Sequence, residues 1–346
     1  LSANQMWNDT TSITKMETAA GTREQLRTTN RTSQMFSPRL QYELDDQQKL
    51  IAELFYRNNK STGVRGDQIQ DDKNDSIRLN TRYERKDKDL SDKVRLTVEH
   101  QTETQLTRSP LNSIYTDETV DEYGLAYDGV HKFDQTGQIK FGVSANNSQL
   151  GSNVSQSLDE QRYALYSEGS WRFTDRQTVT LGARQEWLDR SGLVDYQDHH
   201  LSPVLAYRFD LPNQWSIQTN LSQAFRSPNT DRLIPNVTVS TDSDAGSLNN
   251  PDRGGNPNLK PEKIKAFEST LAFDSASGGV NLTAYHREIK DYIERVIALE
   301  GSRYVERPQN QNEATTASYT HLRAHETEAD LVCPLLLENK TLIYLP

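Results

Sequence analysis

Hydrophobic and polar residues alternate with a period of two along most of this chain, and the segment 162–188 shows the pattern most clearly. There, Tyr163, Leu165 and Trp171 alternate with polar and charged residues until a short polar turn at 174–177, after which the alternation resumes. Residues two apart in sequence lie on the same face of a β-strand. The segment therefore predicts a β-hairpin with one apolar, aromatic face and one charged face.

The same pattern recurs and predicts about twelve strands of roughly ten residues, close to the length that crosses a bilayer when a strand is tilted. The alternating residues that mark these strands lie at 40–44, 50–56, 77–83, 94–98, 123–127, 139–143, 163–173, 179–187, 201–209, 215–221, 267–273 and 280–284. Turns at one end of these strands are mostly short, whereas the connections at the other end are long and polar. The long polar loops are predicted at 57–75, 101–120, 146–160, 189–200 and 226–264.

Short turns at one end of a sheet and long loops at the other are typical of outer-membrane β-barrels. Aromatic residues near strand ends, such as Tyr56, Trp187 and Trp215, fit the aromatic girdles of membrane proteins. The alternative is a soluble β-sandwich or propeller, whose strands are commonly about five or six residues long. The pattern favours an all-β fold, an antiparallel up-and-down transmembrane β-barrel.

The composition is polar for a chain of this length. Hydrophobic residues make up 34% of the chain, charged residues make up 25%, and the mean hydropathy is −0.83. That balance suits strands that bury only one of their two faces. No uninterrupted apolar run is long enough for a transmembrane helix. The net charge of −10 argues against a nucleic-acid-binding surface, so no nucleic-acid partner is expected.

Motifs for catalysis are absent from the sequence, which has no Walker A loop, no G-x-S-x-G elbow and no C-x-x-C pair. The single cysteine excludes an intramolecular disulfide. We therefore expect neither an enzyme nor a bound cofactor. No metal site is expected either: His199 and His200 are expected to face solvent in a loop, and the acidic pair Asp71-Asp72 to be solvated rather than to bind calcium.

Two sequence elements flank the longest predicted loop. The first is Phe225-Arg226-Ser227-Pro228, and the second is Gly-Asn-Pro-Asn-Leu-Lys-Pro-Glu at 255–262. Proline cannot donate to a β-ladder and pushes the preceding residue towards an extended conformation, so the second element is expected to shape the point where the loop re-enters the sheet. The residues with this expected structural role are Phe225, Pro228, Asn256, Pro257, Leu259, Pro261 and Glu262.

These two elements resemble those of the TonB-dependent outer-membrane receptor family, and the resemblance covers about residues 37–316. It implies a barrel of about 22 strands with a plug in its lumen, located in the bacterial outer membrane. It also implies import of a ferric siderophore, or of another scarce molecule such as cobalamin, with energy supplied through TonB. Only about twelve strands and no plug are recognisable, so a partial barrel is expected. The alternatives are a passive porin-type diffusion channel and a soluble all-β binding or adhesin domain.

Ligand contacts are expected from charged residues on the face opposite the apolar one, because barrel interiors are polar and charge there steers an anionic ligand. The candidate ligand-binding residues are Arg162, Glu168, Arg172, Arg184, Glu186, Arg208 and Arg226. The expected partners are TonB, through the plug region, a ferric siderophore or similar chelate, and outer-membrane lipid.

The alternation is poorly defined before residue 37 and stops near residue 317. We therefore divide the chain into an N-terminal barrel segment at 1–36, a partial receptor barrel at 37–316 and a tail at 317–346. The tail resembles a translated library-adapter sequence from Ser318 onwards, so it is expected to be non-native. The alternative is a C-terminal helix, on which closely spaced histidines are a weak zinc-site candidate.

Overall fold

The structure is a computed structural model in which strands dominate. It describes residues 2–18, 21–65, 68–108, 113–133, 136–153, 157–235, 237–238, 245–275, 278–320 and 342–344. A single short helix, α1 (Thr230–Leu233), is present in these ranges. The predicted all-β class is confirmed. Within the described residues, no helix is long and apolar enough to cross a membrane.

The strands correspond closely to the predicted set, which matches β3–β12, β15 and β16. The full set is β1 (Ser2–Thr18), β2 (Gly21–Ser37), β3 (Arg39–Glu43), β4 (Gln48–Arg65), β5 (Gln68–Lys86), β6 (Leu90–Arg108), β7 (Ser113–Phe133), β8 (Gly137–Ser152), β9 (Leu158–Thr174), β10 (Gln177–Gly192), β11 (Tyr196–Asp210), β12 (Trp215–Arg226), β13 (Val237–Thr238), β14 (Asp252–Gly254), β15 (Glu262–Ser275), β16 (Gly278–Glu300), β17 (Arg303–Thr320) and β18 (Leu342–Tyr344). All belong to one sheet. The predicted tail falls partly outside the described residues, so its expected non-native origin stays a prediction.

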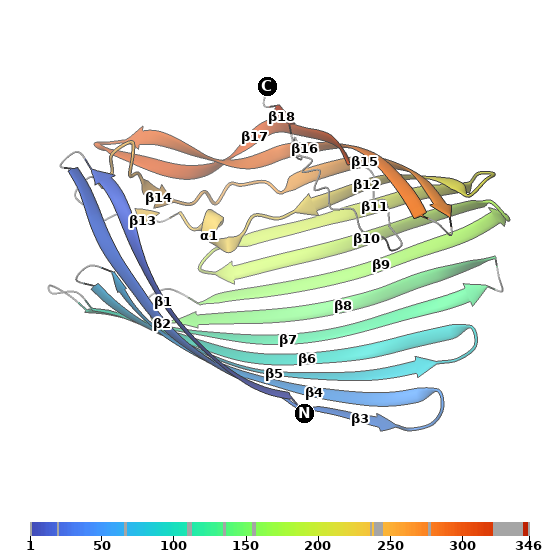
Figure 1. Cartoon of the computed structure of the whole chain (residues 1–346), viewed down its shortest axis with the longest axis horizontal. Helices are drawn as coiled ribbons and strands as arrows, with labels where there is room; N and C mark the ends of the chain where they lie inside the picture. Colours follow the sequence, from blue (N-terminus) through green and yellow to red (C-terminus); the bar gives the residue numbers. More distant parts are fainter. Residues whose placement is uncertain are drawn as a thin grey trace, which may run out of the picture. The chain divides into compact units, whose positions relative to one another are not determined.

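The chain divides into two compact units. Unit 1 comprises Leu1–Gly129, Gly142–Tyr163 and Leu188–Asp195, and unit 2 comprises Val130–Phe141, Ala164–Trp187 and Tyr196–Pro346. Within unit 1, β4 pairs antiparallel with β5, and β5 with β6. Within unit 2, β12 pairs antiparallel with both β11 and β15, and β16 with both β15 and β17 (Figure 1). Consecutive strands therefore form hairpins, as the alternation predicts.

The strands are longer than predicted, and this corrects four of the five predicted loops. Those at 57–75, 101–120, 146–160 and 189–200 consist largely of strand. Between β4 and β5, for example, polar side chains join the two strands: Ser61 Oγ donates to Asp72 Oδ2 at 3.3 Å, and Thr62 Oγ1 donates to Asp71 Oδ1 at 2.8 Å. Both faces are polar there, so the apolar alternation fades while the ladder continues. The Asp71-Asp72 pair is thus engaged by protein side chains.

Each unit has one apolar face. In unit 2, Leu205, Leu221 and Phe267 lie opposite one another on β11, β12 and β15, and they are 39%, 48% and 42% exposed. In unit 1, Leu79 and Val98 are paired in the same way. Soluble proteins rarely expose continuous apolar surfaces of this extent. The apolar face is therefore suited to contact an apolar medium.

Candidate functional site

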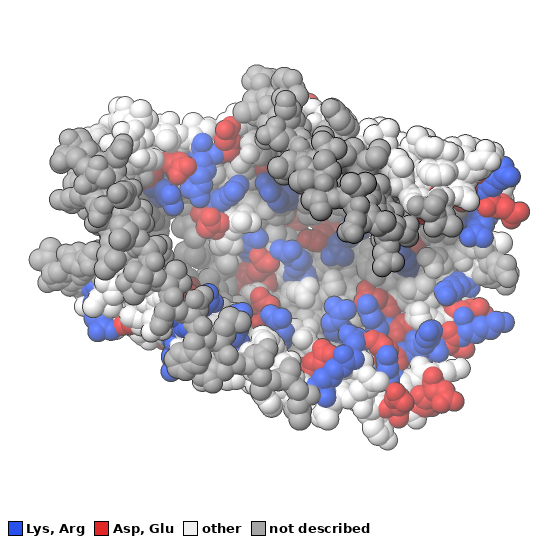
Figure 2. Space-filling model, viewed as in Figure 1, with Lys and Arg blue, Asp and Glu red and all other residues white. Residues whose placement is uncertain are grey.

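A charged hollow lies on the polar face of unit 1. Alternate residues of β4, β5 and β6 lie on this face. Its volume is about 360 Å³. Figure 2 shows basic and acidic side chains intermixed over these strands. We call this the arginine hollow, and its lining residues are Ile51, Glu53, Arg78, Asn80, Arg82, Arg95, Thr97, Glu99 and Glu122.

One side of the arginine hollow is neutralised by an ion pair between an exposed arginine and a buried carboxylate. Glu99 is 7% exposed, and its Oε2 lies 2.6 Å from Nη2 of Arg78, directly opposite on β5. Ser76 Oγ donates a hydrogen bond to the other carboxylate oxygen at 3.1 Å. A buried carboxylate needs such partners, because an unpaired buried charge is costly. This half of the hollow is therefore fixed in structure.

The other side of the arginine hollow brings two arginines together, although the lining as a whole holds three arginines and three glutamates. Arg82 lies directly opposite Arg95 in the β5–β6 ladder, although like charges facing each other are unfavourable. Arg82 Nε lies 2.5 Å from a carboxylate oxygen of Glu84. Among the residues that the structure describes, Arg95 forms no ion pair. The pair of guanidinium groups is therefore able to bind an anionic group, which planar guanidinium does well.

The predicted ligand residues lie along β9–β12 and are not gathered into one hollow. Most are paired with a neighbouring charge at 2.5–3.2 Å. The pairs are Arg162 with Glu160, Glu168 with Lys140, Arg184 with Glu186, Arg208 with Asp210, and Arg226 with Glu262. Arg172 lines a small hollow of about 260 Å³ together with Lys132. Their ligand role remains a proposal.

The Phe225-Arg226-Ser227-Pro228 element fastens the end of β12 to its neighbours. Phe225 stacks on His200, with ring centroids 4.8 Å apart, and Ser227 Oγ donates to Asp198 Oδ2 at 2.6 Å. Pro228 is fully buried. His200 therefore lies in β11 beneath an aromatic ring, which corrects the expectation that it faces solvent in a loop. The segment around His200 is polar, so the alternation of apolar residues did not predict a strand at this position.

The Gly-Asn-Pro-Asn-Leu-Lys-Pro-Glu element returns the long loop to the sheet. Glu262 is 1% exposed and accepts a hydrogen bond from the Ile293 backbone N–H at 2.8 Å. Leu259 is buried, and Asn256 Nδ2 donates to the Pro308 carbonyl at 3.1 Å. These contacts bind the loop end to β16 and β17, and the structural role expected for this element stays a prediction.

Three side chains of β17 hold the long loop, and we call this set with its partners the loop clasp. Arg303 Nη2 donates to Asp252 at 2.8 Å, and Arg307 Nη1 donates to the Gly255 carbonyl at 2.7 Å. Asn310 accepts a hydrogen bond from the Lys260 N–H at 2.8 Å. Gly255 is needed here, because a Cβ atom would come within 2.2 Å of the Ile234 carbonyl oxygen.

The loop clasp also alters ionisation at the end of the β16–β17 hairpin. Hydrogen bonding from Arg307 lowers the pKa of Glu300 below its ordinary value, against a smaller opposing effect of burial. Arg307 Nε donates to Glu300 Oε1 at 2.7 Å. The hydrogen bond to Asp252 raises the pKa of Arg303. The clasp is therefore charged throughout the physiological pH range.

Sequence reasoning missed both the arginine hollow and the loop clasp. The alternation that placed Arg184 on the polar face places Arg82 and Arg95 there too, and would have found the hollow if applied to β5 and β6. The clasp was not accessible in this way, because Arg303 and Asp252 are 51 residues apart. In the described part of the chain, no group of three His, Cys, Asp or Glu residues could hold a metal ion.

Sequence comparisons identify relatives of this chain. Residues 3–318 match the family described as TonB dependent receptor-like, beta-barrel. The iron-regulated outer membrane virulence protein of Vibrio cholerae serotype O1 is 27% identical over 165 residues, which cover 46% of this chain and 23% of that protein. The match therefore spans about a quarter of the length of this curated relative.

Solved structures with the same fold include the siderophore receptor PirA from Pseudomonas aeruginosa. Its TM-score is 0.67 at 14% identity, covering 86% of this chain and 55% of that one. The Serratia marcescens hemophore receptor HasR, solved with its hemophore HasA and heme, has a TM-score of 0.65 at 12% identity, covering 93% of this chain and 60% of that one. At such identities, the likeness shows the fold alone.

Proposed function

Because the chain belongs to the TonB-dependent receptor family and is located in the bacterial outer membrane, we propose that it forms part of an importer for a ferric siderophore. Import is energised through TonB, which contacts the plug region. The family consists of receptors and transporters and is not an enzyme family. Membership of this family disfavours the passive porin-type channel and the soluble binding domain.

The observation that carries this proposal is the arginine hollow on the polar face. Complexes of iron(III) with oxygen-donor chelators are commonly anionic, and paired arginines bind such groups through charge-assisted hydrogen bonds. Lumen-facing charge also steers an anion along its path. Arg82 and Arg95, directly opposite each other, are the strongest candidates for this contact. Arg172 and Arg184, which the sequence predicted as ligand contacts, lie separately in β9 and β10 of unit 2.

The names of relatives support iron as the cargo. The curated relative is an iron-regulated protein, and PirA is a siderophore receptor. The same fold also occurs in the copper transporter OprC and in the hemophore receptor HasR. The fold by itself therefore does not select the substrate, and the facing pair of Arg82 and Arg95 is the reason for preferring an anionic chelate over cobalamin.

Uptake of radioactive iron tests the proposal. The receptor encoded by the intact gene is expressed in a strain without other siderophore receptors, with and without TonB, and supplied with catecholate, hydroxamate and carboxylate chelates in turn. We expect uptake of at least one ferric chelate, and only with TonB. Uptake without TonB, or cobalamin as the only cargo, contradicts the proposal.

A double variant locates the ligand contact within that assay. R82Q/R95Q is expected to raise the chelate concentration needed for half-maximal uptake severalfold. The matched control is R85Q, because Arg85 lies outside the arginine hollow and is paired with Asp92 at 2.5 Å. Equal effects of the two variants contradict a ligand contact in the hollow.

A further inference from the structure

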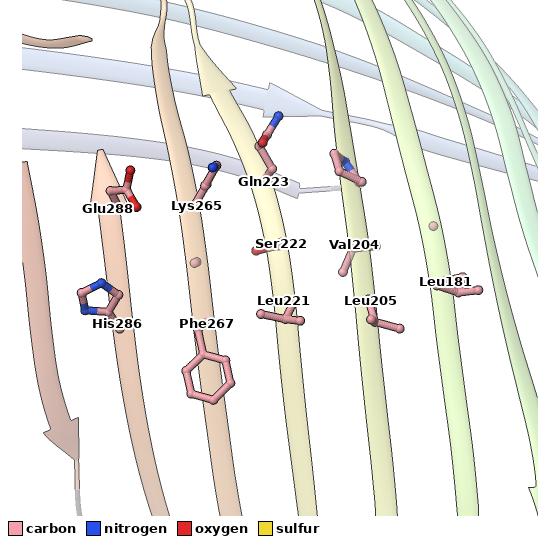
Figure 3. Close-up of a pocket in the computed structure, with 13 residues that line it drawn as sticks. Leu181, Val204, Leu205, Leu221, Ser222, Gln223, Lys265, Phe267, His286 and Glu288 are labelled. Carbon is pink, nitrogen blue, oxygen red and sulfur yellow. The ribbon is translucent and has the colours of Figure 1, made fainter. Parts of the chain in front are cut away.

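A groove crosses the apolar face of unit 2. It has a volume of about 450 Å³ and lies over β10, β11, β12, β15 and β16. Leu181, Leu205, Leu221 and Phe267 lie in a row across it (Figure 3). This groove is on the face opposite the candidate ligand residues Arg184 and Arg208, so it is separate from the ligand contacts proposed above.

The lining of the groove changes from apolar to polar within one step along the strands. Leu221 and Phe267 lie opposite each other, and two residues further along the same strands Gln223 lies opposite Lys265 (Figure 3). One such step is about 7 Å. Glu288 lies opposite Lys265 on the next strand, β16. The apolar belt therefore ends at this row, on the side of the long loop.

Two lysines at this end of the groove are not neutralised by the protein. Lys263 lies directly opposite Lys290 in the β15–β16 ladder, and Lys265 is on the same face of β15. The nearby carboxylate of Glu288 forms its ion pair with Lys290, at 3.3 Å from Nζ to Oε1. In the described part of the chain, neither Lys263 nor Lys265 forms an ion pair, and both residues are exposed.

We propose that this groove holds an acyl chain of a phosphorylated outer-membrane lipid whose phosphate is bound by Lys263 and Lys265. The apolar row accommodates hydrocarbon, and the lysines stand where a headgroup begins. Lysines at a membrane surface attract anionic headgroups, and their aliphatic stems lie comfortably on apolar surface. A second copy of the chain on this face would bring its own lysines against these two. The proposal depends on the membrane location and is independent of the transported cargo.

Lipid retention by the receptor encoded by the intact gene tests this proposal. The receptor is extracted from outer membranes in mild detergent, and bound lipid is identified by native mass spectrometry. It is then stripped and exposed to vesicles containing either a bis-phosphorylated lipid A or phosphatidylethanolamine. We expect retention of the phosphorylated lipid and a weaker response to the zwitterionic one. Equal retention of both lipids, or a dimer formed through this face, overturns the proposal.

Two variants separate the headgroup contact from the acyl contact. K263Q/K265Q is expected to weaken binding of the phosphorylated lipid about fivefold for each lysine removed. L221W fills the groove and is expected to reduce retention of either lipid. The matched control is K140Q, since Lys140 is on the polar face and paired with Glu168 at 3.2 Å. Unchanged retention in K263Q/K265Q, or an equal loss in K140Q, overturns the proposal.

Discussion

Glu262 is a buried charged residue at the start of β15. It is 1% exposed, accepts the Ile293 N–H and pairs with Arg226, whose side chain is 60% exposed. E262A removes the only described acceptor of that N–H and is expected to lower the free energy of unfolding by about 1–3 kcal/mol. E262Q keeps an acceptor and loses only a half-solvated ion pair, so its effect should be smaller. Urea unfolding of the folded receptor measures both, and equal effects contradict this role.

At the same scale, Glu300 makes the loop clasp sensitive to acid. Its pKa is lowered by Arg307, so this contact stabilises the folded state above the ordinary glutamate pKa and is lost as the pH falls through the lowered value. We expect the clasped segment 252–260 to stay protected from protease at neutral pH and to open only below about pH 4. Proteolysis with an acid-active protease measures this. E300Q should weaken that pH dependence, because the pair of Arg303 and Asp252 remains in the clasp. Opening of the native loop near pH 6 contradicts the expectation.

At the scale of elements, the structure differs from the sequence-based expectation because the strands continue into polar segments that were predicted to be loops. Alternation located β4 and β5 because Leu50, Leu79 and their neighbours form an apolar face. It could not locate the continuation through Ser61 and Asp72, where both faces are polar and side-chain hydrogen bonds accompany the backbone pairing. The loop clasp was inaccessible for a different reason, since its contacts join distant segments. The alternation pattern thus predicts the strand segments that carry an apolar face well, and it predicts the polar extensions of the same strands poorly.

Hydrogen exchange tests the strand extensions. Amides of residues 57–64, which pair with β5, are expected to be protected to nearly the same extent as those of 50–56. The reason is that both segments share one continuous ladder. Amides at 245–250 in the long loop, which has few backbone pairings, should exchange faster. Rapid exchange throughout 57–64 would return this segment to the loop that the sequence predicted.

At the scale of the whole molecule, the central claim is that the strands cross the outer membrane with their apolar face against lipid and their charged face towards water. β11 is the best place to test it, because Pro203, Leu205 and Tyr207 are exposed on the apolar face and alternate with residues of the polar face. The family assignment and the proposed importer both depend on this arrangement.

Site-by-site labelling along residues 203–208 of the receptor in intact outer membranes provides the most direct measurement. Single cysteines are introduced in a background without Cys333 and modified with a spin label whose contact with oxygen and with a water-soluble relaxing agent is recorded. The account predicts lipid contact at positions 203, 205 and 207 and water contact at 204, 206 and 208. Uniform accessibility along β11, or alternation in the opposite phase, would contradict it.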